Sequence, residues 1–137
     1  MGRPFFFYGT LQRELARGEA GRLVAGLGEG VVASVRGALF AIEDPHGCYP
    51  ILMLGGSRRV TGRVVDCPDD RRWLARMDAY EGGEYFRRRV RAHLADGSAV
   101  WAEAYIFRRR FGAGFVPIAH GDFARFLTET GCRALSA

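Results

Sequence analysis

The chain has 137 residues, of which 48% are hydrophobic and 26% charged, an ordinary composition for one globular domain, so we expect residues 1–137 to form a single domain. No apolar run approaches the ~20 residues of a membrane-spanning helix and the N-terminal segment has no secretory pattern, so we expect a cytoplasmic protein with no membrane partner. All cationic residues behind the net charge of +5 are arginine, and lysine and asparagine are absent, which is typical of a GC-rich genome; we therefore expect no nucleic-acid partner.

The first half of the chain predicts several strands and one short helix. Residues 5–8 are an aromatic run that ends at Gly9, as in a buried strand that enters a turn. Residues 11–25 predict a short, imperfect helix interrupted by glycines, and residues 26–30 a glycine-rich linker. Three further strands are expected at residues 31–41, 51–54 and 60–65, separated by turn signals.

The second half predicts two helices and a hairpin. Asp69 is a suitable N-cap for a helix over residues 70–77, which we expect to end before Tyr80. Asp96 and Gly97 form a hairpin turn between strands at residues 85–94 and 100–107. A last helix is expected over residues 122–130, ended by Gly131. Short strands with few helices and no β-α alternation indicate an α+β fold on a curled, barrel-like sheet.

The cysteines and histidines do not indicate a metal site. Cys48, Cys67 and Cys132 contain no C-x-x-C pair and are odd in number, so we expect reduced thiols, and the three histidines lack ligand spacing. We therefore expect no metal and no cofactor. Cys48 follows His46 closely, and a thiol beside an imidazole can act as a nucleophile, but no acid lies nearby in sequence to orient the pair. A small apolar filler is the favoured interpretation of Cys48.

Two segments are candidates for chemistry. Glu81 lies between an amphipathic helix and a strand, where aromatic surroundings would raise its pKa toward that of a general base; a solvated loop glutamate is the alternative. Tyr8, Gly9, Thr10 and Leu11 lie where a buried strand turns through glycine. Their backbone N–H groups can form an anion-binding concavity, although Gly9 alone can equally serve a tight turn.

These segments resemble the γ-glutamylcyclotransferase-like family, which includes AIG2-like and γ-glutamylamine cyclotransferase proteins. The similar blocks follow one another in order at residues 6–11, 37–40, 48–52, 60–65, 77–87 and 102–106. The most specific block, residues 77–87, is similar to the family's L-D-x-x-E-G pattern with a following Y-x-R. Met77 stands where leucine is usual, which conserves volume.

The resemblance implies a six-stranded, barrel-like mixed sheet with flanking helices and an enzyme that needs no cofactor. Its substrate would be a small γ-glutamyl amide, whose α-amine attacks the side-chain carbonyl to release 5-oxoproline. Glu81 would be the catalytic acid and base. The loop of Tyr8, Gly9, Thr10 and Leu11 would bind the glutamyl end of the substrate.

Tyr85 and Tyr105 are expected to close the wall of the substrate pocket. Residues 12–20 are more charged and more helical than the short loop of the amine-specific members, so the leaving amine stays open. A non-catalytic module of the same fold that binds a small molecule or an anion is the alternative. An arginine-dependent nucleic-acid binder is a second, and affinity that falls steeply with salt would distinguish it. The sequence does not indicate an oligomeric state.

Overall fold

The structure is a computed structural model that describes residues 2–9, 18–108 and 114–134. Six strands form one sheet in the order β3-β1-β5-β4-β2-β6, and an additional pairing between β3 and β2 closes the first five into a barrel. The strands are β1 (Arg3–Phe7), β2 (Val31–Asp44), β3 (Gly47–Cys67), β4 (Tyr85–Leu94), β5 (Ala99–Phe107) and β6 (Phe115–Ile118). This arrangement confirms the predicted six-stranded, barrel-like mixed sheet.

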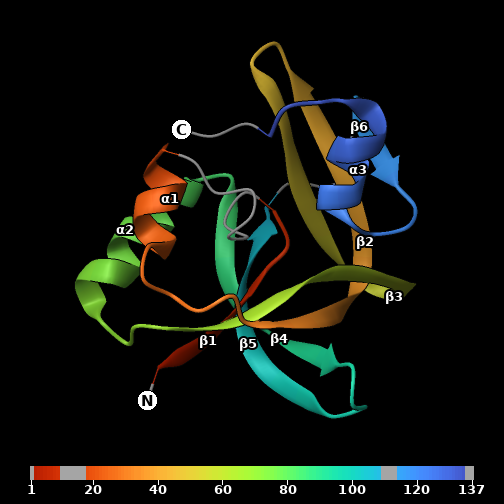
Figure 1. Cartoon of the computed structure of the whole chain (residues 1–137). Helices are drawn as coiled ribbons and strands as arrows, with labels where there is room; N and C mark the ends of the chain where they lie inside the picture. The colour runs from red at the N-terminus through yellow and green to blue at the C-terminus, as the bar shows by residue number, and fades with distance from the viewer. Residues whose placement is uncertain (1, 10–17, 109–113, 135–137) are drawn as a thin grey trace.

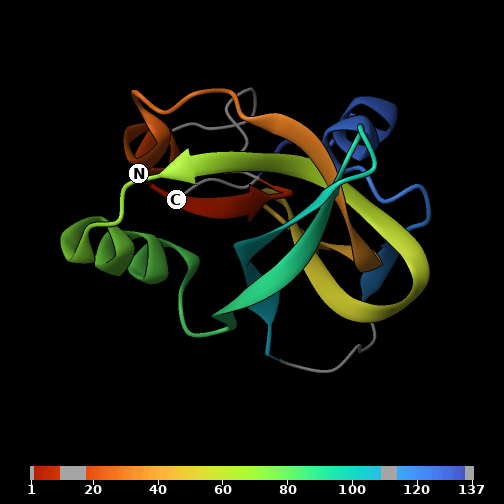
Figure 2. The ribbon, with the colours of Figure 1, turned by 90° about the horizontal axis from the view of Figure 1, so that it is seen from below.

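Three helices flank the barrel: α1 (Gly18–Val24), α2 (Arg71–Glu81) and α3 (Phe123–Thr130). Figure 1 shows α1 and α2 together on one side of the barrel and α3 beside β6 on the other. In Figure 2 the red β1 and the yellow-green second half of β3 run side by side, and β1 is antiparallel to β3 and parallel to β5. The helices therefore leave part of the barrel's outer face uncovered.

The aromatic run of β1 is buried on both faces of the sheet. Because side chains alternate along a strand, Phe6 and Tyr8 point into the barrel core. Phe5 and Phe7 point outward into a second cluster, which α1 and α2 cover with Leu23 and Met77 among other side chains. A strand buried on both faces is apolar throughout, which explains the uninterrupted aromatic sequence.

The predicted boundaries differ from the structure in three places. The two strands expected at residues 51–54 and 60–65 are parts of the single long strand β3, which crosses Gly55 and Gly56 with positive φ angles of 101° and 83°. Strand β6 was not predicted. Helix α2 begins after the N-cap Asp70 and continues to Glu81, so the expected end before Tyr80 is wrong. Of the helix expected over residues 11–25, the structure describes α1, and residues 10–17 lie outside the described part.

The expectation of three reduced thiols is also wrong. A disulfide links Cys48 at the start of β3 to Cys132, and Cys67 is a buried free thiol. The backbone N–H of Cys48 donates to the carbonyl of Arg133 at 2.7 Å, which brings the segment after α3 alongside β3. The two cysteines are 84 residues apart, so no local pattern could indicate the pair. Because reducing compartments keep thiols reduced, the state of this pair depends on where the protein resides.

We predict that Cys132→Ser lowers the free energy of unfolding by roughly 2–4 kcal/mol, since the disulfide restricts a long loop in the unfolded chain. Urea unfolding of the oxidised protein, with and without a reductant, measures the effect. The reductant should destabilise the wild type by a similar amount and leave Cys132→Ser unchanged. Three free thiols in the denatured, unreduced wild type would contradict the pairing.

Candidate functional site

Helix α2 places Glu81 at its C-terminal end. The side chain of Asp70 accepts hydrogen bonds from the backbone N–H groups of Arg72 at 2.8 Å and Trp73 at 3.3 Å, which fixes the start of the helix. Gly82 ends it with a φ angle of 84°, and its N–H donates to the carbonyl of Asp78 at 3.0 Å. A residue with a side chain rarely adopts this φ. The glycine directly after Glu81 therefore ends the helix at Glu81.

A chain of alternating charges attaches α2 to the barrel. Asp78, one turn before Glu81, accepts from the guanidinium of Arg87 on β4 at 3.0 Å. Arg87 also donates to Glu103 on β5, which in turn pairs with Arg3 on β1 at 3.0 Å. Arg3 also forms an ion pair with Asp69, just before α2, at 3.0 Å. The network thereby fixes the position of α2 relative to three strands.

Three tyrosines lie near Glu81. Tyr8, which follows β1, donates its hydroxyl proton to the backbone carbonyl of Tyr105 at 2.5 Å. Tyr85 donates to the carbonyl of Pro50 at 2.8 Å, and Tyr105 donates to Asp78 at 2.6 Å. Each phenol thus has a fixed partner for its single proton. The charge of Glu81 influences Tyr8, Tyr85 and Tyr105, so the structure places these four residues near one another, while their roles stay predictions.

The electrostatics single out Glu81 as the group in this cluster that titrates near neutral pH. Burial raises the pKa of Tyr8, Tyr85 and Tyr105 well above the ordinary value, and the nearby charge of Glu81 raises each pKa further. Burial also raises the pKa of Glu81 from 4.5 to about 8. The C-terminal end of a helix disfavours a carboxylate as well, which acts in the same direction. The phenols therefore stay neutral while Glu81 can exchange a proton.

Gly9 is required by a close approach rather than by an unusual backbone angle. A Cβ atom at this position would lie 2.5 Å from Cγ of Pro50, the residue whose carbonyl binds Tyr85. Its φ is not among the positive values. Thr10 and Leu11 lie outside the described residues, so the anion-binding concavity expected there stays a prediction.

Sequence reasoning missed three contributors to the site. Tyr49 on β3 lies close enough to Tyr85 that a phenolate there would raise the pKa of Tyr85, and Pro50 supplies the carbonyl that holds the Tyr85 hydroxyl. Both lie in the block at residues 48–52, which contributed to the family resemblance but to which the sequence analysis assigned no role. The contribution of Arg87 through Asp78 and Glu103 was also missed, because these partners lie on two other elements, α2 and β5.

The described residues contain no group of three or more histidine, cysteine, aspartate or glutamate side chains arranged to hold a metal ion. Asp78 and Glu103 are both bound by Arg87. No helix in the described ranges is long and apolar enough to cross a membrane.

Comparison with known proteins assigns the family. The model of the gamma-glutamyl cyclotransferase, AIG2-like family matches residues 5–125. The chain belongs to this family. A search of curated proteins found no match.

Solved structures of similar fold agree with membership of the gamma-glutamyl cyclotransferase, AIG2-like family. YkqA from Bacillus subtilis has a TM-score of 0.72 at 19% identity over 96% of this chain, which spans only 43% of YkqA. An AIG2-like protein from Mus musculus has a TM-score of 0.67 at 17% identity, over 88% of this chain and 87% of that one. A gamma-glutamyl cyclotransferase has a TM-score of 0.63 at 16% identity, over 85% of this chain and 72% of that one. At these identities the likeness shows the fold alone.

We predict that Gly9→Ala lowers the free energy of unfolding by about 1–3 kcal/mol, because the added methyl group overlaps the ring of Pro50. Gly83→Ala is the matched control, since nothing lies within 4 Å of its added Cβ. Chemical unfolding of the two variants measures the difference. Equal stabilities would show that Gly9 is not closely packed.

We predict that the contribution of Glu81 to the stability of the wild type falls as pH rises from about 4.5 to 8. The pKa of Glu81 is raised in the folded state, so the folded protein binds more protons than the unfolded chain in this range. Glu81→Gln, which mimics the neutral acid, should be more stable than the wild type by more than about 1 kcal/mol at about pH 9. The gap should shrink at about pH 5. Unfolding free energies across pH measure it, and a gap that is independent of pH would contradict the raised pKa.

Proposed function

We propose that the chain is a γ-glutamyl cyclotransferase-type enzyme that releases 5-oxoproline and a free amine or amino acid from a γ-glutamyl amide. The observation that carries this proposal is the carboxyl group of Glu81, whose pKa is raised by desolvation and which lies near three neutral tyrosines. Family membership supports the same class of enzyme. The proposed reaction is an intramolecular attack, so the protein mainly has to fold the substrate and move protons.

The pKa of Glu81 suits the first step of this reaction. The α-amine of the substrate must lose a proton before it can attack, and an α-amino group has an ordinary pKa of about 8. Burial raises the pKa of Glu81 to about 8, so transfer from the α-ammonium to Glu81 is nearly balanced in free energy. A solvated glutamate would hold the proton far too weakly for this exchange.

The remaining steps need no outside reactant. The free amine forms a bond to the γ-carbonyl carbon, and the carbonyl oxygen becomes an oxyanion. When the oxyanion collapses, the bond to the leaving nitrogen breaks and that nitrogen receives the protons lost by the attacking one, through Glu81. The backbone N–H groups at Gly9, Thr10 and Leu11 are proposed to hold the substrate's α-carboxylate or the oxyanion. No proton or water is consumed overall.

The tyrosines are proposed to shape the pocket rather than to exchange protons. Burial keeps the pKa of Tyr85 and Tyr105 far above neutral pH, and the hydroxyl protons of both are held by a carbonyl or a carboxylate. Rings fixed in this way can hold the glutamyl chain in a folded conformation. Holding an intramolecular nucleophile in position can supply effective molarities of ~10⁵ M or more.

We predict that Glu81→Gln lowers kcat by at least ~10²-fold, because glutamine keeps the size of the side chain but cannot accept and return a proton. Formation of 5-oxoproline from a panel of γ-glutamyl amides measures this. Substrate affinity should change little, since the loop at Tyr8 is proposed to hold the glutamyl end.

Glu84→Gln is the control, because Glu84 is exposed and lies only three residues from Glu81. The substitution makes the same change from carboxyl to amide. Turnover by Glu81→Gln at the wild-type rate would remove Glu81 from the mechanism. A folded wild type that binds a γ-glutamyl compound without releasing 5-oxoproline would favour the non-catalytic binding module instead.

A further inference from the structure

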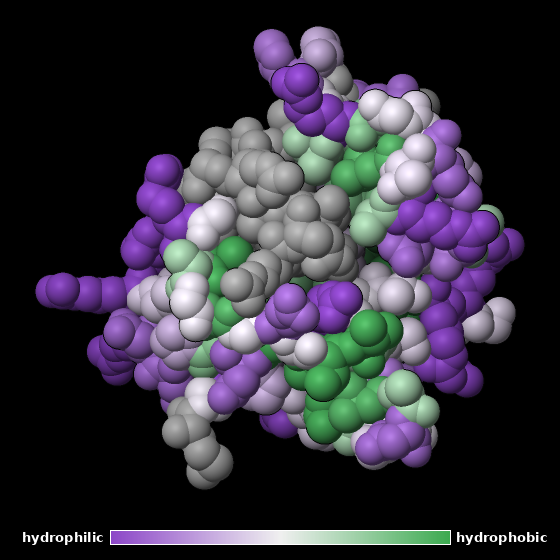
Figure 3. All heavy atoms as spheres, in the orientation of Figure 1, coloured by the Kyte–Doolittle hydropathy of each residue, from purple (hydrophilic) through white to green (hydrophobic). Residues whose placement is uncertain are grey.

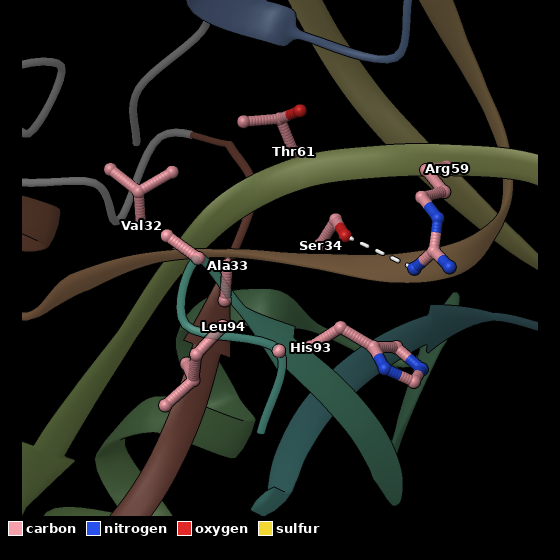
Figure 4. A pocket seen from close by; sticks show the side chains of 9 residues that line it. Val32, Ala33, Ser34, Arg59, Thr61, His93 and Leu94 are labelled. Carbon is pink, nitrogen blue, oxygen red and sulfur yellow. Dashed lines mark hydrogen bonds between the residues drawn. The ribbon is translucent and has the colours of Figure 1, made fainter. Parts of the chain in front are cut away.

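An arginine-lined groove lies on the barrel, apart from the Glu81 cluster. It has a volume of about 450 Å³, and five arginines from three strands line it together with an exposed tryptophan. These residues, which we call the arginine groove, are Arg36, Arg59, Arg88, Arg89, Arg91 and Trp101. A second hollow of about 390 Å³ continues it, because both are lined by Arg59 and His93. Figure 4 shows these two side chains extending into the same space from facing strands.

Among the residues that the structure describes, no acid that lines the groove balances its positive charge. Neither hollow has a described aspartate or glutamate in its lining. Within the part of the chain that the structure describes, the carboxylate pairs belong to other arginines, such as Arg3 and Arg87. The side chain of Arg59 donates to the neutral hydroxyl of Ser34 at 3.3 Å. Several guanidinium groups without a counter-charge repel one another, so an anion of several charges would relieve the repulsion.

Trp101 adds a flat, exposed aromatic surface among these charges. The residue is 51% exposed, which is unusual for tryptophan. The guanidinium carbons of Arg89 and Arg91 lie 5.2 and 5.6 Å from the centre of its ring, so two cation–π contacts hold the ring in place. An exposed, positioned aromatic ring beside arginines is the combination that stacks on bases and binds phosphates in single-stranded nucleic acids.

Apolar surface lies next to the charge. Leu54 lines the groove and Val32 and Leu94 line its continuation, and Val32 and Leu54 are exposed. Figure 3 shows green apolar surface beside purple hydrophilic side chains at the lower right, over the part of the barrel where the ribbons of β4 and β5 meet in Figure 1. A purely ionic partner would make no use of this apolar surface, whereas ribose and base surfaces can.

We propose that the arginine groove binds single-stranded nucleic acid, with Trp101 stacked on a base and the guanidinium groups on the phosphates. A duplex is a poorer fit, because its bases already stack on one another and offer no face to Trp101. The positions of the arginines, and not their number, support this site, in contrast to the composition-based expectation of no nucleic-acid partner.

The test is the affinity of the full chain for a fluorescently labelled single-stranded oligonucleotide, measured by anisotropy across a salt series. If all five arginines meet a phosphate, the slope of log affinity against log salt should be about −3.5. The chain has two tryptophans, and the indole of Trp73 is held by the carbonyl of Leu23 at 3.0 Å. Binding should therefore change the fluorescence of Trp101, and Trp101→Phe should lose most of that change.

Matched variants separate stacking from charge. Trp101→Ala should weaken binding about ten-fold or more, and Trp101→Phe should restore much of the loss, which also controls for misfolding. The double change Arg36→Gln and Arg88→Gln should reduce the salt slope by about 1.4. The control is Arg71→Gln with Arg72→Gln, which removes the same charge from the exposed start of α2 and should leave the slope unchanged.

Three results would overturn the proposal. The first is that Trp101→Ala and the groove double variant bind like the wild type. The second is that inorganic polyphosphate or a polyglutamate peptide competes as well as the oligonucleotide at equal charge, because the groove would then recognise charge without bases. The third is that a duplex of the same sequence binds as tightly as the single strand.

Discussion

The structure depends on holding one carboxyl group in a place that disfavours its charge. Glu81 is the last residue of α2, where the helix dipole opposes a negative charge, and burial raises its pKa to about 8. Such a position is stable only if α2 cannot move to expose the group. The alternating charges of Asp69, Arg3, Glu103, Arg87 and Asp78 hold the helix against three strands. Arg87 forms ion pairs with the carboxylates of Asp78 and Glu103, and not with Glu81.

The closed barrel determines what surrounds that carboxyl group. Because β1 lies between β3 and β5, the alternation that buries Phe6 in the core also directs Tyr8 inward, where its hydroxyl reaches the backbone of Tyr105 on β5. Strand β3 contributes Pro50 on the opposite side, in contact with both Gly9 and Tyr85. The disulfide at Cys48 fixes the start of that same strand. A change in the register of β1 or β3 would therefore separate the tyrosines from Glu81.

Local signals predicted the elements that local chemistry determines. The turn at Asp96 and Gly97 fixed the hairpin of β4 and β5, and Asp122 with Gly131 fixed the ends of α3. The predicted end of α2 came too early. Glu81 is a good helix former, so the helix continues through it and stops only at Gly82. The glycines at 55 and 56 were interpreted as a turn although β3 continues through them, and the two cysteines of the disulfide are 84 residues apart, too far for a local pattern to pair them. For the site, the family resemblance indicated Glu81 and its tyrosines, whereas the carbonyls and ion pairs that position them are visible only in the fold.

Arginine has two different electrostatic roles in this chain, and composition alone does not distinguish them. Arg3 and Arg87 each lie between two carboxylates, so their charges are neutralised and they act as structural links. The arginines around Trp101 lie on β2, β3 and β4, and no described carboxylate lines their groove. Glu103, which stands opposite Arg89 in the strand register, is bound by Arg3 and Arg87. Arginine that accumulates through codon bias would be distributed over the surface with acids between. The arginines gather around the exposed tryptophan because of strand register. Strands β4 and β5 pair Arg91 with Trp101, and this pairing places Arg89 and Arg91 on the same face as Trp101.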